Sequence, residues 1–455
     1  MKEIPEVFLV CSAFLHFARF LEGIFIFLSI FTWLAQGLLY IWAESCKKFS
    51  ERNMNMRESF KMVNFEQDRE NTCNFDFLSK EKAEEIQKFH KSFPMYEPTP
   101  LACLADTAKA LGLGAVYVKD ESYRFGLNAF KVLGGSYAIG NYLAGRLGKT
   151  AGEITYGDLI SEETRKELGD VTFVTATDGN HGRGVAWTAR QFHQKAVVYM
   201  PKGSAAERLA NIQAEGADAS ITDLNYDDAV RLANSQAEKN GWVMVQDTAW
   251  EGYEEIPTWI MQGYGTMGLE AYKQLPEKPT HIFLQAGVGS MAGAVAGLFT
   301  NIYGGERPVI TIVEPNKADC LYRTAEANDG ERHFVTGDMD TIMAGLACGE
   351  PCSIGWEVLK NCVDHFISCP DYAAAKGMRI LGNPAGADQK VISGESGAAA
   401  FGCVAEILTN PDLADLKKEL GLDENSRVLF FSTEGDTDKE NYKAIVWDGK
   451  YPSVK

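Results

Sequence analysis

The chain has 455 residues, of which 45% are hydrophobic and 23% are charged, and its formal net charge at pH 7 is −18. This length is enough for two or three domains with hydrophobic cores, and the composition is that of a globular enzyme. The acidic balance argues against nucleic acid as a partner, because phosphate binding needs clustered lysine and arginine. It argues equally against a general attraction to anionic lipid.

Residues 1–55 differ from the rest of the chain. Residues 23–43 form an uncharged apolar run that is long enough to cross a bilayer. Lysines and arginines follow between 47 and 57, so a span would leave the rest of the chain in the cytoplasm. The alternative is a non-functional extension, with the working chain beginning near Met54 or Met56. We therefore expect a cytoplasmic catalytic body, anchored to a membrane only if the apolar run is a true anchor.

The ten cysteines are spread from Cys11 to Cys403 without a metal-binding framework. The nearest pair, Cys348 and Cys352, has no histidine neighbours at ligand spacing. We expect no metal and mostly reduced, partly buried thiols. A pairing such as Cys320 with Cys348 stays open.

From about residue 80 strand-like and helical patterns alternate, which predicts βαβ units and parallel sheets. We expect an α/β protein with two three-layer αβα domains around a central cleft, where ligands bind. The larger domain would comprise 56–135 and 255–455, and the smaller one 136–254. A helix is predicted at 79–93, and strands at 115–121, 171–177, 196–201, 220–224, 242–247, 281–286, 309–315 and 427–433.

The segment RFGLNAFKVLGGSYA, residues 124–138, places Lys131 after Phe130 and before a Gly-Gly pair. Desolvation lowers the pKa of a lysine amine, and a neutral amine can form a Schiff base. The alternative is an ordinary surface lysine at the start of a helix. This segment alone does not separate the two interpretations.

A second segment, TATDGNHGRGVAW at 175–187, has the pattern of a strand end, a polar turn and the start of an apolar helix. Asn180 and the backbone amides are suited to holding an oxygen-bearing ligand, and Asp178 would face the same cleft. Asp and Asn are also favoured at helix N-caps without any function. Both interpretations stay open.

A third segment, HIFLQAGVGSMAGAVAG at 281–297, runs from a strand through Gly287 and Gly289 into a helix of small residues. Backbone amides at a helix N-terminus bind phosphate. The turn lacks the full G-x-G-x-x-G pattern, and no ribose-binding acid follows at the usual distance, which argues against a dinucleotide. The glycine-rich turn alone is weak evidence for a phosphate site.

Three further segments end strands or open helices. Asp247 ends a predicted strand, where active-site residues concentrate in open α/β sheets. Residues 391–402 form a small-residue turn that opens a helix. Ser432 and Thr433 end another strand, and we attribute the carboxylates that follow them to a solvated loop rather than a metal site.

The order of these motifs resembles that of the fold-type II pyridoxal-phosphate enzymes, the tryptophan synthase β-like family. An early lysine is followed by the asparagine turn, the glycine turn and a late strand end with Ser or Thr. The resemblance implies that Lys131 forms a Schiff base with pyridoxal 5'-phosphate. It also implies that Asn180 contacts the ring hydroxyl and that Thr433, or Ser432, faces the ring nitrogen. The other implied cofactor contacts are Phe130, Gly287, Val288, Gly289, Ser290 and Met291.

Between about 75 and 450, the motifs KDESYRFGLNAFK, TDGNHGRGVAW, VQDTAWEGYEEIPTWIMQGY and STEGDTD further resemble the diaminopropionate ammonia-lyase family. This implies α,β-elimination of 2,3-diaminopropionate, as the D or L isomer or both, to pyruvate and two molecules of ammonia. Lys131, Asp178 and Asp247 are the candidate bases. The carboxylates are also suited to binding the second ammonium, and an aspartate of raised pKa would donate a proton to the leaving amine.

Two alternatives stay open. The first is a serine or threonine dehydratase with the same fold, lysine and cofactor. The second is a non-catalytic protein that only binds pyridoxal phosphate. For the enzyme we expect a small amino-acid substrate, no nucleic acid, no metal and a homodimer, which is common among similar enzymes.

Overall fold

The computed structural model describes residues 20–21, 60–65, 75–177 and 179–453. The apolar run at 23–43 and the candidate base Asp178 lie outside the described residues. The chain divides into two units, Met1–Glu58 and Ser59–Lys455, and the fold below is that of the second. Within the described ranges, none of the helices combines the length and hydropathy needed to cross a membrane.

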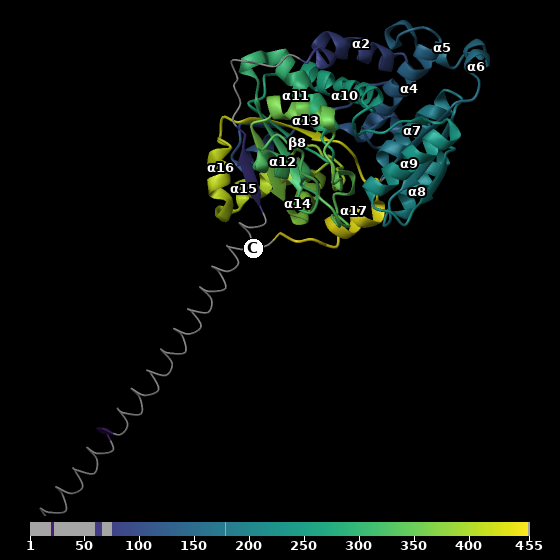
Figure 1. The fold of residues 1–455 in the computed structure, drawn as a ribbon. Helices are drawn as coiled ribbons and strands as arrows, with labels where there is room; N and C mark the ends of the chain where they lie inside the picture. The colour runs from purple at the N-terminus through teal and green to yellow at the C-terminus, as the bar shows by residue number, and fades with distance from the viewer. Residues whose placement is uncertain (1–19, 22–59, 66–74, 178, 454–455) are drawn as a thin grey trace, which may run out of the picture. The chain divides into compact units, whose positions relative to one another are not determined.

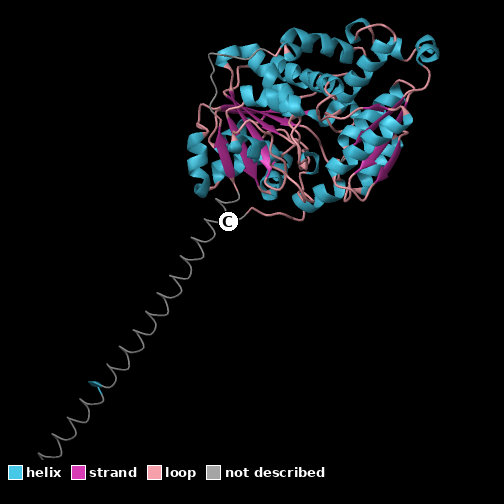
Figure 2. Ribbon diagram, in the orientation of Figure 1, coloured by secondary structure: helices cyan, strands magenta, loops and turns pink. Residues whose placement is uncertain are grey.

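Two separate sheets organise the second unit (Figure 2). The larger has seven strands, in which the edge strands β1 and β2 are antiparallel and the five between them are parallel. Its order is β1 (Lys61–Asn64), β10 (His365–Cys369), β9 (Val309–Pro315), β8 (His281–Gln285), β11 (Arg427–Ser432), β3 (Ala115–Asp120) and β2 (Leu101–Cys103). The smaller, fully parallel sheet has the order β6 (Asp218–Ile221), β5 (Lys195–Met200), β4 (Thr172–Ala176) and β7 (Val243–Met244).

Helices connect these strands, and α7, α8 and α9 gather around the smaller sheet (Figure 1). Their bounds are α2 (Lys80–Lys91), α3 (Ala105–Leu111), α4 (Val132–Arg146), α5 (Tyr156–Leu159), α6 (Glu162–Leu168), α7 (Asn180–Gln191), α8 (Ala206–Ala214), α9 (Tyr226–Asn240), α10 (Glu255–Gln274), α11 (Ser290–Tyr303), α12 (Cys320–Ala327), α13 (Ser353–Cys362), α14 (Asp371–Gly382), α15 (Ala399–Thr409), α16 (Ala414–Glu419) and α17 (Lys439–Val446).

The larger sheet is the middle of three layers. Its central strands β8 and β11 are mostly apolar and buried along nearly their whole length, as expected where both faces of a sheet are covered. Alternate side chains enter two different cores: Ile282 and Leu284 pack with α10 and α11, whereas Phe283 packs with α14 and α15. The predicted three-layer α/β arrangement with mostly parallel strands is therefore observed for this sheet.

The strands of the larger sheet fall within 56–135 and 255–455, and those of the smaller sheet fall within 136–254. The exact domain boundaries stay a prediction, because Ser59–Lys455 packs as one compact unit.

Two predicted strands end earlier than expected. Strand β6 stops at Ile221, because Thr222 Oγ1 accepts the Leu224 amide in a turn. Strand β7 stops at Met244. Beyond it, the Gln246 side chain, rather than a backbone carbonyl, accepts the hydrogen bond from the Ala176 amide of β4, at 3.0 Å. The short edge strands β1 and β2 and the interior strand β10 were not predicted.

A buried ionic cluster ties β3 to α10 just before the candidate Schiff-base lysine. Lys119 Nζ lies 2.7 Å from Glu270 Oε2, and Arg124 Nη2 lies 2.8 Å from the same oxygen and 2.9 Å from Glu121 Oε1. All four side chains are buried. Burial acts to raise the pKa of Glu270, but Arg124 and Lys119 outweigh it and lower this pKa to about 2. The cluster therefore holds an ionised Glu270 between two basic side chains inside the fold.

His90 makes the fold sensitive to acid. It is fully buried, with Nδ1 2.7 Å from Thr266 Oγ1 and Nε2 3.1 Å from the Leu133 carbonyl. Burial, with help from the Arg124 guanidinium, lowers the pKa of His90 to about 3. The unfolded chain, where a histidine pKa is about 6.5, binds more protons between these values, so stability falls as pH falls through this window, by up to about 1.4 kcal/mol per pH unit.

Urea unfolding between about pH 7 and pH 5 checks this prediction. The loss of stability on acidification should be smaller in His90→Gln than in the wild type. His193→Gln, at an exposed position, is the control and should keep the wild-type slope. An unchanged slope in His90→Gln would show that other groups cause the acid sensitivity.

Candidate active site

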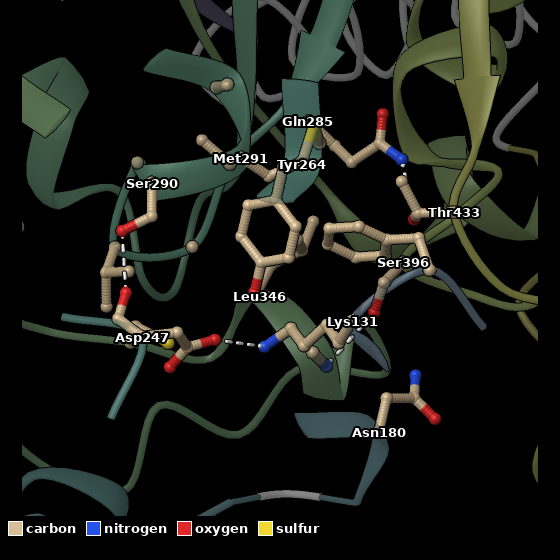
Figure 3. Close-up of a pocket in the computed structure, with 18 of the residues that line it drawn as sticks. Lys131, Asn180, Asp247, Tyr264, Gln285, Ser290, Met291, Leu346, Ser396 and Thr433 are labelled. Carbon is tan, nitrogen blue, oxygen red and sulfur yellow. Dashed lines mark hydrogen bonds and ion pairs between the residues drawn. The ribbon is translucent and has the colours of Figure 1, made fainter. Parts of the chain in front are cut away.

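One pocket collects the predicted site residues that the structure describes (Figure 3). Asp178 is the exception, since it lies outside the described residues. Ser432, the alternative to Thr433, donates to Ser393 Oγ at 2.8 Å and is not part of the lining. The lining includes Phe130, Lys131, Asn180, Asp247, Gly287, Val288, Gly289, Ser290, Met291 and Thr433.

Lys131 is held in this pocket by the segment that precedes it. The Phe130 amide donates to the Thr433 carbonyl at 3.1 Å, and the Gly435 amide donates to the Asn128 carbonyl at 3.0 Å. Asn128 has φ = 60°, a left-handed conformation in which asparagine is enriched. These bonds place the start of α4, and hence Lys131, beside the end of β11.

Asp247 is the partner of Lys131. Lys131 Nζ lies 2.9 Å from Asp247 Oδ2, and both side chains are largely buried (Figure 3). The Tyr226 hydroxyl donates to Asp247 Oδ1 at 3.3 Å, and Ser290 Oγ donates to the Asp247 carbonyl at 2.6 Å. Tyr226, at the start of α9, thus holds the carboxylate, and Ser290, at the start of α11, holds the backbone of Asp247.

Asp247 is not an aspartate of raised pKa. Burial acts to raise its pKa, but the charges of Lys131 and His181 and the hydrogen bonds from Lys131 and Tyr226 outweigh burial. The pKa of Asp247 therefore lies well below its ordinary value. An ionised carboxylate is a base and a cation-binding group, not a proton donor.

The glycine turn faces the same pocket. It ends at Gly289, whose φ of 98° favours glycine, and α11 begins at Ser290. A Cβ atom on Gly287 would lie 3.1 Å from Cys348 Sγ and 3.2 Å from the Gly345 carbonyl. A side chain at Gly287 would therefore press against the facing segment, while the turn and the start of α11 line the pocket. Amides at a helix N-terminus are suited to an anion.

Two polar contacts define the opposite wall. Gln285 Nε2 donates to Thr433 Oγ1 at 2.9 Å, which orients the hydroxyl at the end of β11 (Figure 3). Asn180 Nδ2 donates to Glu434 Oε2, and Glu434 Oε1 accepts the Ser396 amide at 3.0 Å. Sequence reasoning missed Gln285, Ser396 and Glu434, although each lies within or beside a quoted motif.

Comparison with known proteins identifies the family. The family model described as "Pyridoxal-phosphate dependent enzyme" matches residues 93–433. A Salmonella typhimurium protein named diaminopropionate ammonia-lyase is 55% identical over 371 residues, which cover 80% of this chain and 92% of that protein. This chain belongs to the diaminopropionate ammonia-lyase family.

Solved structures agree with this assignment. The crystal structure of Escherichia coli diaminopropionate ammonia lyase in complex with D-serine has a TM-score of 0.80 and 47% identity, covering 86% of this chain and 98% of that chain. A threonine deaminase from Solanum lycopersicum, with a TM-score of 0.63 and 19% identity, covers 87% of this chain and 99% of that chain, and it shares the fold alone. The predicted fold-type II class is confirmed.

The family's cofactor, pyridoxal 5'-phosphate, fits the residues present. The pocket offers an amine on Lys131 and the amide-lined turn before α11. It is also lined by Gln285 and Tyr264, and the buried atoms Gln285 Oε1 and Tyr264 Oη have no hydrogen-bond partner among the described residues. Buried polar atoms without partners are costly, which indicates that a polar ligand belongs here. The diaminopropionate ammonia-lyase pocket therefore has the groups that a phosphate-bearing aldehyde needs.

A second cavity of about 270 Å³ continues from the lysine pocket. The two share Lys131, Tyr226, Gly345 and Cys348 as lining residues. The second cavity is further lined by the turn after β5, by the start of α8 and by the first turn of α17. A substrate that reaches Lys131 from this side passes through this cavity.

Proposed function

We propose that this chain catalyses the α,β-elimination of 2,3-diaminopropionate to pyruvate and two molecules of ammonia. The observation that carries the proposal is the buried contact of 2.9 Å between Lys131 and Asp247 in the pocket of a family member. An amino acid that is to lose its Cα proton on such a cofactor needs both an amine that can be displaced and a carboxylate beside that amine. This pair supplies both.

Pyridoxal phosphate, when bound, withdraws electrons from the Cα atom of the amino acid joined to it and so makes the Cα proton acidic. We assign Lys131 to hold it, with Phe130 packing beside it. Asn180 and Thr433 supply polar contacts on the β11 side of the pocket, and Gly287 to Met291 supply backbone amides for the phosphate.

Lys131 and Asp247 are the groups that we assign to proton transfer at Cα, with Asp178 as a third candidate. Lys131 Nζ and Asp247 Oδ2 lie within hydrogen-bonding reach, so the carboxylate stabilises a proton gained by the amine. Tyr226 holds that carboxylate in place, and Ser290 holds the backbone carbonyl of the same residue. Bases on two faces of a planar substrate would serve both the D and the L isomer.

The substrate assignment is tested by kcat/KM for D- and L-2,3-diaminopropionate against D- and L-serine and L-threonine. We expect the best diamine isomer to exceed every hydroxy amino acid by at least about tenfold, because a buried carboxyl group binds an amino group more strongly than a hydroxyl. A preference for serine or threonine would move the chain to the dehydratases. Bound cofactor without turnover of any of these would favour the non-catalytic alternative.

We also propose a homodimer, as is common among similar enzymes, with its catalytic body in the cytoplasm. The membrane anchor at 23–43 stays a prediction, because that run lies outside the described residues. A full-length chain that remains in the pellet after detergent-free extraction would support the anchor, and a soluble chain would contradict it.

A further inference from the structure

The reaction proposed above needs a proton donor for its leaving group. In the lysine pocket, Asp247 does not fill this role. Ammonia is a poor leaving group unless its nitrogen is protonated as the bond to Cβ breaks. Asp247 is held ionised by Lys131 and His181. The second cavity, which continues from Lys131, contains another carboxyl group that is suited to this task.

Glu395 is that group. It lines the second cavity, and only 2% of its surface is exposed, whereas Asp338 and Asp340 on the same cavity are exposed and Asp438 is half-buried. Among the described residues that line this cavity, Glu395 is thus the one fully buried carboxyl group. Buried carboxyl groups without a full ion pair are uncommon and concentrate at functional sites.

The surroundings of Glu395 fix it in place. The flanking Gly394 amide donates to the Glu434 carbonyl at 2.9 Å, and the Ser396 amide donates to Glu434 Oε1 at 3.0 Å. Asn441, in the first turn of α17, donates from Nδ2 to Glu395 Oε1. Glu395 therefore sits on a turn anchored to the wall that Asn180 also contacts.

Burial and the charges around Glu395 bring the pKa of its carboxyl group close to neutral pH. Burial raises its pKa to about 7, the nearby Glu434 carboxylate adds to this, and Arg208 on α8 and the Asn441 hydrogen bond oppose it. The other charged groups that line the cavity are Lys131, Lys202, Asp338, Asp340 and Asp438. A carboxyl group of this kind can carry a proton at neutral pH and release it.

We propose that Glu395 binds the β-amino group of the diamine and supplies the proton with which that nitrogen leaves as ammonia. This inference rests on the proposed function. The Glu395 acid gives its proton to the neutral β-amine, and the Cβ–N bond then breaks with its electron pair staying on nitrogen. Ammonia departs, Glu395 is left as a carboxylate, and the pair of electrons for the new Cα–Cβ double bond comes from the broken Cα–H bond.

The test compares two leaving groups on the holoenzyme. Chloride leaves β-chloroalanine without a proton, so this substrate bypasses the need for an acid. We expect Glu395→Gln to lower kcat for 2,3-diaminopropionate by about 100-fold, the lower end of what a general acid contributes, and to change kcat for β-chloroalanine by less than about threefold. Glu440→Gln removes an exposed carboxylate beside Asn441 and should leave both rates unchanged.

Each other outcome contradicts the proposal. Equal losses with both substrates would mean that Glu395 only supports the structure, and no loss would mean that another group is the acid. Should the glutamine variant fail to fold, Glu395→Asp is the second variant, because it keeps an acid on a side chain that is one methylene shorter. It should lower the ratio of kcat for the diamine to kcat for β-chloroalanine by about tenfold. A wild type that releases pyruvate from β-chloroalanine but not from the diamine would instead overturn the proposed function.

Discussion

Lys131→Ala is expected to abolish pyruvate release from 2,3-diaminopropionate, with a loss of at least about 1,000-fold in kcat. The substitution removes the only amine that the described part of the pocket presents beside the glycine turn, and it leaves Asp247 without its 2.9 Å partner. Both the attachment of the cofactor and the proton transfer at Cα would be lost. Pyruvate formation and the absorbance of bound cofactor are the two measurements.

Lys195→Ala is the matched control for this substitution. Lys195 is exposed on β5 and pairs with exposed Asp170 at 2.7 Å. Its removal should leave the rate unchanged, because exposed ion pairs contribute little. If Lys131→Ala retained more than about one tenth of the wild-type rate, Lys131 would not be the Schiff-base lysine.

Glu270→Gln is expected to lower the free energy of unfolding by about 3–5 kcal/mol, because it leaves Arg124 and Lys119 as buried cations with Glu121 alone to balance them. The melting temperature of the holoenzyme, or its urea midpoint, measures the loss. Because the cluster also fixes the stretch that leads to Lys131, cofactor affinity should fall as well.

Glu277→Gln provides the comparison for Glu270. Glu277 pairs with Arg427 at 3.2 Å, but its side chain is 54% exposed. The expected change in stability is below about 1 kcal/mol. Equal effects of the two substitutions would show that the buried cluster is no more important to stability than a surface pair.

The parts of the site that sequence reasoning predicted are local in the chain. Lys131, the turn at Gly287–Ser290 and the strand end at Thr433 each belong to a short motif whose neighbours determine its conformation. The apolar runs of β8, β9 and β11 were likewise sufficient to predict buried parallel strands. Local patterns of this kind need no knowledge of distant contacts.

The parts that were missed depend on contacts between distant segments. Glu434 lies next to Thr433, but its hydrogen bond from Asn180 crosses 254 positions of the chain. The low pKa of Asp247 follows from Lys131, 116 positions away, and could not be read from the segment around Asp247. Glu395 was quoted only within a small-residue turn, because its burial depends on α8 and α17.

The most direct test of the central claim is the ratio of ammonia to pyruvate released from 2,3-diaminopropionate by the purified holoenzyme. Elimination of the β-amine followed by loss of the α-amine predicts two molecules of ammonia for each pyruvate, with the release of both lost in Lys131→Ala. Absence of pyruvate from either isomer of the diamine, with release of keto acid and a single ammonia from serine or threonine, would contradict the account.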